Sequence, residues 1–184
     1  MRWGALGCRR RLYFAYANDW SPETDMALRL EDIELIKQLK YRYCTAIDTC
    51  DTAVFPTLFT DDIEVDYVGG SYRFQASGRD AVIGALTQAF HSRFLSSHTV
   101  HHPIIEVHDD DTADGRWTLV DYNIEFNHRM VTSGTSFYAD KYVKQNGKWL
   151  IKSSSYSRLY ERVEPIEVTL NLTAHYLGEK DNKR

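Results

Sequence analysis

Apolar residues recur at a helical spacing along the segment LEDIELIKQLKYRYCTAID, residues 30–48. Ile36, Leu39, Tyr43 and Ile47 follow one another at intervals of three, four and four residues, so they share one face of a helix with 3.6 residues per turn. The pattern predicts an amphipathic helix that packs this face against the rest of the protein.

Two shorter helices and one strand are predicted next. Asp51 precedes TAVFPTLF and fits the N-cap position of a short helix. The segment IEVDYV, residues 63–68, has the composition of a strand. In SGRDAVIGALTQAF, Ser77 and Asp80 stand at capping-box spacing, which predicts the start of a third helix.

From residue 98 onward the pattern becomes that of strands. The segments HHPIIEVH, DGRWTLVDYNIEF, TSFYADKYVK and KWLIKSSSYSRLYERV are rich in aromatic and β-branched residues, and Asn146-Gly147 between the last two is a hairpin signal. Helices followed by an antiparallel meander define an α+β domain. Because the last strand is long, we expect a strongly curved sheet that the helices close into a cone around an internal pocket.

Length and composition fit one such domain. The chain has 184 residues, of which 43% are hydrophobic and 13% aromatic, enough for a sizeable core. We expect a flexible extension over residues 1–27, the cone over residues 28–162, and a tail over residues 163–184 that packs on a neighbouring subunit or closes the pocket.

Charge and cysteine content narrow the class of protein. The net charge of −4 argues against nucleic acid or a membrane surface as a partner, because both are polyanionic and favour a basic face. No apolar run approaches the roughly twenty residues of a membrane span. The three cysteines lack metal-site spacing and their number is odd, which indicates a reducing cytoplasm.

Two aspartates stand where the patterns favour apolar residues. Asp121 shares a strand face with Trp117 and Leu119, so it either faces inward or reaches the solvated end of the strand. Asp48 ends the first helix, where the helix dipole disfavours a carboxylate. It therefore takes part in a turn or has a partner, and a histidine is the obvious candidate.

The segment SSHTVHHP, residues 96–103, holds three of the seven histidines. By alternation through Pro103, His101 shares a face with Ile105 and Val107, so we expect His101 to face inward. The three histidines do not share one strand face, which argues against a metal site. An inward histidine is either a hydrogen-bonded core residue or a proton-transfer group.

The last hairpin brings one arginine among tyrosines. A two-residue Asn146-Gly147 loop places Val143 opposite Leu150, Phe137 opposite Tyr156, and Thr135 opposite Arg158. Arg158 is then either buried with an anionic or carbonyl partner or exposed at the end of the sheet.

Together these segments resemble the SnoaL-like branch of the nuclear transport factor 2-like superfamily, which has the cystatin-like cone fold. The resemblance rests on DIELIKQLKYRYCTAID, SHTVHHPIIEV, TADGRWTLVDY and SFYADKYVKQNGKWLIKSSSYSRLYE, and it runs from about Leu30 to Tyr160. Within that branch the bacterial bile acid 7α-dehydratases are the nearest match, and scytalone dehydratase and the lindane dehydrochlorinase are more distant.

The resemblance implies a set of catalytic residues. Matched by motif, they are Tyr43, Asp48, His101, Asp121 and Arg158. His101 would be the base, Asp48 would hold its tautomer, and Tyr43 would donate to the developing oxyanion. Asp121 would assist the leaving group or position its neighbours, and Arg158 would stabilise charge or anchor a carboxylate.

The implied activity is that of a carbon–oxygen lyase, a dehydratase that eliminates water from a steroid-like or polycyclic hydroxy-ketone. No cofactor or metal is expected, because elimination beside a carbonyl needs only proton movement. An isomerase or cyclase of the ketosteroid type and a non-catalytic binding protein remain the alternatives. We expect a homo-oligomer, with the trimer favoured, and a pocket lined by Phe55, Tyr67, Trp117, Leu119, Tyr138 and Tyr156.

Overall fold

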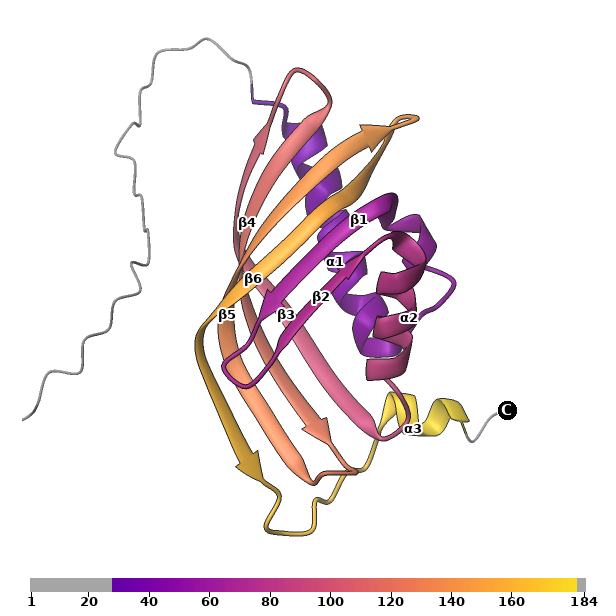
Figure 1. The fold of residues 1–184 in the computed structure, drawn as a ribbon, viewed down its shortest axis with the longest axis vertical. Helices are drawn as coiled ribbons and strands as arrows, with labels where there is room; N and C mark the ends of the chain where they lie inside the picture. The colour runs from indigo at the N-terminus through magenta and orange to yellow at the C-terminus, as the bar shows by residue number, and fades with distance from the viewer. Residues whose placement is uncertain (1–27, 182–184) are drawn as a thin grey trace, which may run out of the picture.

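The computed structural model describes residues 28–181 as one curved sheet with helices packed on its concave side (Figure 1). The helices are α1 (Leu30–Thr49), the short 3₁₀ helix η1 (Phe55–Thr57), α2 (Arg79–Ala89) and α3 (Tyr176–Asp181). The strands are β1 (Phe59–Val68), β2 (Arg73–Ser77), β3 (Phe94–Val107), β4 (Thr112–Glu125), β5 (Met130–Gln145) and β6 (Lys148–Pro165). This arrangement confirms the predicted α+β cone. The extension predicted over residues 1–27 lies outside the described residues.

The sheet has the strand order β2-β1-β6-β5-β4-β3. All neighbouring strands are antiparallel except β1 and β6, which run parallel. The long strands β3 to β6 form the meander that the sequence predicts, so the residues on their concave face turn toward α1.

Helix α1 packs its apolar stripe into the core. Ile36, Leu39, Tyr43 and Ile47 are all buried, as the spacing predicts. In the first turn of α1, Asp32 accepts hydrogen bonds from Nε1 of Trp149 at 2.7 Å and Nζ of Lys144 at 2.8 Å. Both partners come from the β5–β6 hairpin, which therefore fixes the start of α1 against the sheet.

Neither of the two predicted helix caps forms as predicted. Oδ1 of Asp51 accepts the backbone N–H groups of Ala53 and Val54, at 3.1 and 3.3 Å, and so supports the turn before η1, but the N-cap of η1 is Val54 and not Asp51 as predicted. The capping box predicted for α2 is wrong. The N-cap of α2 is Gly78, and no side chain caps this helix.

The hairpin register is correct near the turn and wrong beyond it. Val143 lies opposite Leu150 as predicted, but a bulge follows between Lys141 and Tyr142. The extra residue moves the pairing by one position, so Tyr156 lies opposite Tyr138 and Arg158 opposite Ser136. The shift matters for the site, because it puts Arg158 opposite a residue of the concave face.

Candidate active site

The carboxylate at the end of α1 contacts strand β3. Oδ1 of Asp48 accepts hydrogen bonds from Nδ1 of His98 at 2.6 Å and from Oγ of Ser96 at 2.7 Å, and Oδ2 accepts the backbone N–H of His98 at 2.9 Å. Burial alone would raise the pKa of Asp48, but the hydrogen bonds outweigh it and lower the pKa from its ordinary 3.8. Asp48 is therefore an ionised acceptor that orients the His98 ring.

The histidine partner of Asp48 is thus His98, and the inward-facing position predicted for His101 is wrong. Before the bulge in β3, Ser96, His98 and Val100 turn to the partly buried side, whereas His101 is exposed. The register shifts between His101 and Ile104, and His102 adopts a positive φ of 48°. One extra residue exchanges the two faces of the strand, so alternation counted back from Ile105 fails at this point.

Asp121 and Arg158 form a two-pronged ion pair on the same side of the sheet. Nη1 of Arg158 lies 2.5 Å from Oδ1 of Asp121, and Nη2 lies 2.8 Å from Oδ2. Both side chains are almost fully buried, with exposed fractions of 6% and 3%. Asp121 therefore faces inward and does not reach a solvated strand end, and Arg158 has the anionic partner that a buried guanidinium needs.

Further contacts hold Arg158 in place. Its Nε donates to Oε2 of Glu161 at 3.2 Å, and Nη2 lies 3.4 Å from the hydroxyl of Tyr72. Burial would lower the pKa of Arg158, but the Asp121 carboxylate outweighs this and raises it. A side chain on Gly134 would bring a Cβ within 3.1 Å of Nη1, so this glycine leaves the guanidinium its space. With two carboxylates already bound, Arg158 is poorly placed to anchor a third.

The Asp48–His98 pair and the Asp121–Arg158 pair are neighbours across the sheet. His98 lies directly opposite Asp121 in the β3–β4 register, and Asp121 lies opposite Gly134 of β5. Two buried polar atoms near this pair, Oγ of Ser136 and Oδ1 of Asn123, have no hydrogen-bond partner among the described residues. Buried polar atoms are usually hydrogen-bonded, so these two atoms are available to a water molecule or a ligand.

The hydroxyl of Tyr43 is already used in a hydrogen bond to another tyrosine. Its hydroxyl lies 2.7 Å from that of Tyr67, which donates to Oγ of Ser154 at 3.1 Å, and Ser154 donates to Oδ1 of Asp140 at 2.7 Å. Because the single hydroxyl proton of Tyr67 is donated to Ser154, the hydroxyl of Tyr43 must donate to that of Tyr67. Burial raises the pKa of Tyr43 well above its ordinary value. In this arrangement Tyr43 has no proton left for a substrate oxyanion.

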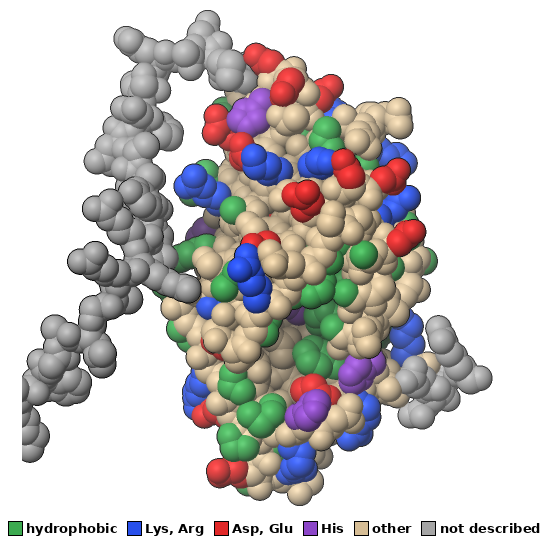
Figure 2. Space-filling model, viewed as in Figure 1, with side chains coloured by type: hydrophobic (Ala, Val, Ile, Leu, Met, Phe, Trp, Pro, Cys, Tyr) green, Lys and Arg blue, Asp and Glu red, His purple; other side chains and the backbone are tan. Residues whose placement is uncertain are grey.

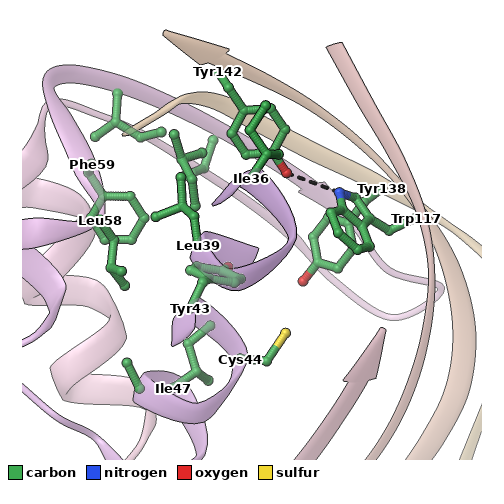
Figure 3. Close-up of a cluster of buried hydrophobic side chains, with 14 of the residues drawn as sticks. Ile36, Leu39, Tyr43, Cys44, Ile47, Leu58, Phe59, Trp117, Tyr138 and Tyr142 are labelled. Atoms are coloured by element: carbon green, nitrogen blue, oxygen red, sulfur yellow. Dashed lines mark hydrogen bonds between the residues drawn. The ribbon is translucent and has the colours of Figure 1, made fainter. Parts of the chain in front are cut away.

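The carboxylate of Asp140, at the end of this series of hydrogen bonds, pairs with a fully buried lysine. Nζ of Lys40 lies 2.8 Å from Oδ2 of Asp140, and both side chains have an exposed fraction of 0%. Oδ2 also accepts the hydroxyl of Tyr142 at 2.8 Å, and Tyr142 in turn accepts Nε1–H of Trp117 at 3.0 Å. Figure 3 shows this last hydrogen bond beside the apolar side chains of α1. This pair was not predicted from the sequence, although Lys40 follows Ile36 by one helical turn on the apolar face.

The residues predicted to line the pocket are mostly part of the packed core. Those with an exposed fraction of 7% or less are Phe55, Tyr67, Trp117, Leu119 and Tyr138. Tyr156 is half-buried and stacks on Tyr67 with 4.5 Å between ring centroids. Tyr67, Tyr138 and Tyr156 thus form one aromatic cluster beside Arg158, whereas Phe55 lies in η1 under the helices.

Three surface hollows of the structure are lined by other residues, namely around His108 and Lys141, around Glu64 and Ser154, and around Arg93 and His175. Figure 2 shows apolar side chains gathered on the lower half of the visible face around a recess. Within residues 28–181, no three His, Cys, Asp or Glu side chains converge as metal ligands. None of the helices in this range is long and apolar enough to cross a membrane.

The chain belongs to the family of the SnoaL-like domain, whose family model matches residues 28–155. This range includes α1, the first five strands and the part of β6 that ends just before Tyr156. It leaves Arg158, Glu161 and the whole C-terminal segment outside the match.

Solved structures share the fold at low sequence identity. A putative scytalone dehydratase from Novosphingobium aromaticivorans DSM 12444 is 22% identical, with a TM-score of 0.64, over 77% of this chain and 97% of that chain. A hexachlorocyclohexane dehydrochlorinase, LinA type 2, is 13% identical, with a TM-score of 0.67, over 80% and 97%. ActVI-ORFA from Streptomyces coelicolor is 15% identical, with a TM-score of 0.57, over 70% and 98%. At these identities the likeness concerns the fold.

Proposed function

We propose that the protein is a cofactor-independent lyase, a dehydratase that removes water from a hydrophobic steroid-like or polycyclic hydroxy-ketone. The observation that carries the proposal is the contact between Asp48 and His98 on the concave face of the sheet. A histidine oriented by a carboxylate is the arrangement that general acid–base catalysis uses near neutral pH. The similarity to a putative scytalone dehydratase and a dehydrochlorinase supports an elimination reaction.

His98 is the proposed base. Its Nδ1 donates to Asp48, so Nε2 is the basic atom of the neutral ring. Nε2 takes the acidic C–H proton of the ketone, and the electron pair of the C–H bond forms the enolate. The C–O bond then breaks, the new double bond forms, and the departing hydroxide takes the proton from the imidazolium to leave as water. One histidine therefore serves first as base and then as acid.

The other charged groups support this cycle without exchanging protons. Asp121 is bound to Arg158 through both oxygens, so it acts as a fixed carboxylate that positions the guanidinium. Arg158 remains cationic, and its hydrogen bonds to Asp121 and Glu161 make it a fixed wall of the site and not a free anion-binding group. Because Asp121 and Glu161 already occupy Arg158, a neutral ketone suits the site better than a substrate carboxylate at this point.

The bile acid 7α-dehydratase resemblance suggests the first substrate to test. Purified protein is incubated with a 7α-hydroxy-3-oxo-Δ4 steroid while the absorbance of the extended conjugated product is followed, with Asp48→Asn alongside. A rise in absorbance with the wild type that is lost in Asp48→Asn supports dehydration through the dyad. If the steroid binds and its double bond migrates without loss of water, the protein is an isomerase, and binding without any conversion favours a carrier.

We further propose that the protein works in the cytoplasm as a homo-oligomer, with the trimer favoured. Several apolar side chains of the C-terminal segment, including Val168, Leu172 and Tyr176, are exposed in the single chain. Such residues are commonly covered in an assembly. The molar mass in solution, measured by light scattering, tests the oligomer.

A further inference from the structure

The last described helix, α3, reaches the two elements that carry Asp48 and His98. Nζ of Lys180 donates to the carbonyl oxygens of Thr49 at 3.1 Å and of Cys50 at 2.9 Å. Nε2 of His175 donates to the carbonyl oxygen of Phe94 at 3.0 Å. Figure 1 shows α3 below α2, beside the start of β3. This segment therefore bridges the end of α1 and the start of β3.

Lys180 adds a cation to the C-terminal end of α1. Helix α1 ends at Thr49 and is followed by Cys50 in the left-handed conformation, and its last turn contains no basic residue. The final carbonyl groups of a helix lack partners within the helix and carry partial negative charge. The backbone N–H groups of Cys50 and Asp51 already bind the carbonyls of Ile47 and Ala46, at 3.0 and 2.9 Å. Lys180 binds the carbonyls that follow and supplies the cation, directly after Asp48.

His175 performs the matching task on β3. Phe94 is the first residue of this strand, which continues to Ser96 and His98. The His175 ring packs on Phe126 with 5.3 Å between ring centroids, and a Cβ on Gly178 would lie 2.6 Å from its Nδ1. Leu177, between these residues, is buried with an exposed fraction of 4%. The imidazole is therefore fixed by packing and fixes the start of the strand.

We propose that Lys180 and His175 are positioning residues that hold Asp48 and His98 at hydrogen-bonding distance. Lys180 acts through the backbone at the end of α1, and His175 acts through the backbone at the start of β3. The inference rests on the proposed role of the Asp48–His98 dyad, and it extends that function to a segment beyond the residues that the family model matches.

The test is the proton NMR signal of the His98 Nδ1–H group, which a short hydrogen bond to a carboxylate moves far downfield. In the full-length protein, the signal is assigned by its loss in Asp48→Asn. Lys180→Met and His175→Ala are expected to lose the signal or move it upfield. Lys180→Arg keeps the cation and His175→Gln keeps an N–H donor, so both are expected to retain it. Turnover of the dehydration substrate should fall on the order of tenfold in the first pair, mainly in kcat.

Lys37→Met is the matched control, because Lys37 lies on α1 and its ion pair within residues 28–181 is with Glu34, at 3.6 Å, near the surface. It should leave the signal unchanged. A wild-type signal in both Lys180→Met and His175→Ala would overturn the positioning role, and its absence from the wild type would overturn the dyad as well. If the signal behaves as expected but no steroid is converted, the positioning role stands and the proposed reaction fails.

Discussion

Nδ1 of His98 lies 2.6 Å from Oδ1 of Asp48, although fifty residues separate them in the chain. The contact exists because the last turn of α1 ends beside the first half of β3, where Ser96 and the backbone N–H of His98 bind the same carboxylate. Three donors on one carboxylate fix its orientation, and the carboxylate fixes the tautomer of the ring. The proton-transfer role that we propose follows from this geometry.

Asp48 should make the stability of the protein depend on acid pH. Its pKa is lowered from 3.8 in the folded protein, so its contribution is fully present above that value and is lost as the pH falls through the lower folded-state pKa. Asp48→Asn removes this contribution. Urea unfolding at neutral pH and near pH 3 should therefore show a difference between wild type and variant that shrinks in acid. A difference that stays constant or grows in acid would contradict the lowered pKa.

Gly134 should tolerate no side chain. A Cβ there would lie 2.5 Å from the carbonyl oxygen of Tyr160 and 3.1 Å from Nη1 of Arg158, so Gly134→Ala should lower the free energy of unfolding by about 1–3 kcal/mol. Gly84→Ala is the matched control. Gly84 lies in α2 with no atom within 4 Å of its Cβ position, and alanine there should stabilise the helix by about 0.5–1 kcal/mol. Equal stability of Gly134→Ala and wild type in urea unfolding would contradict the packing around Arg158.

Replacing one member of the buried Lys40–Asp140 pair should lower the free energy of unfolding more than replacing both. Lys40→Met leaves the Asp140 carboxylate without its cation in the core, so unfolding should become easier by about 3–5 kcal/mol. Adding Asp140→Asn to the same protein removes the unpaired charge and should recover part of the loss. The free energies of unfolding of the two single variants and the double variant measure this coupling. Additive losses would show that the two residues do not interact.

Much of the fold could be predicted from the sequence because its apolar patterns are strong and local. The stripe of Ile36, Leu39, Tyr43 and Ile47 fixed α1, and Asn146-Gly147 fixed the final turn. The signal for the buried ion pair was also present. Lys40 stands on the apolar face of α1, and Asp140 alternates with Tyr138 and Tyr142, all of them buried. A charged residue on each of two apolar faces indicates a pair.

The site was harder to predict, because two β-bulges decide which side chains meet. The bulge after His101 turns His98 inward and His101 outward, and the bulge before Tyr142 moves Arg158 from Thr135 to Ser136. Alternation counts residues, so one extra residue reverses every face that follows. Pro103 was a warning of the first bulge, since proline in a strand is confined to edges and bulges, and β3 is an edge strand.

A comparison of His98 with His101 provides the most direct test of the proposed mechanism, because His98 is the proposed base. A 3-oxo-Δ4 steroid that lacks the 7-hydroxyl group is incubated in D₂O, and NMR measures deuterium uptake at its acidic γ-carbon, which reports the base without requiring a leaving group. His98→Asn should slow the exchange by about 10²–10⁴-fold, and His101→Asn should leave it within a few-fold of wild type, with both variants melting as cooperatively as the wild type. Loss of exchange in His101→Asn with retention in His98→Asn would contradict the assignment of His98 as the base.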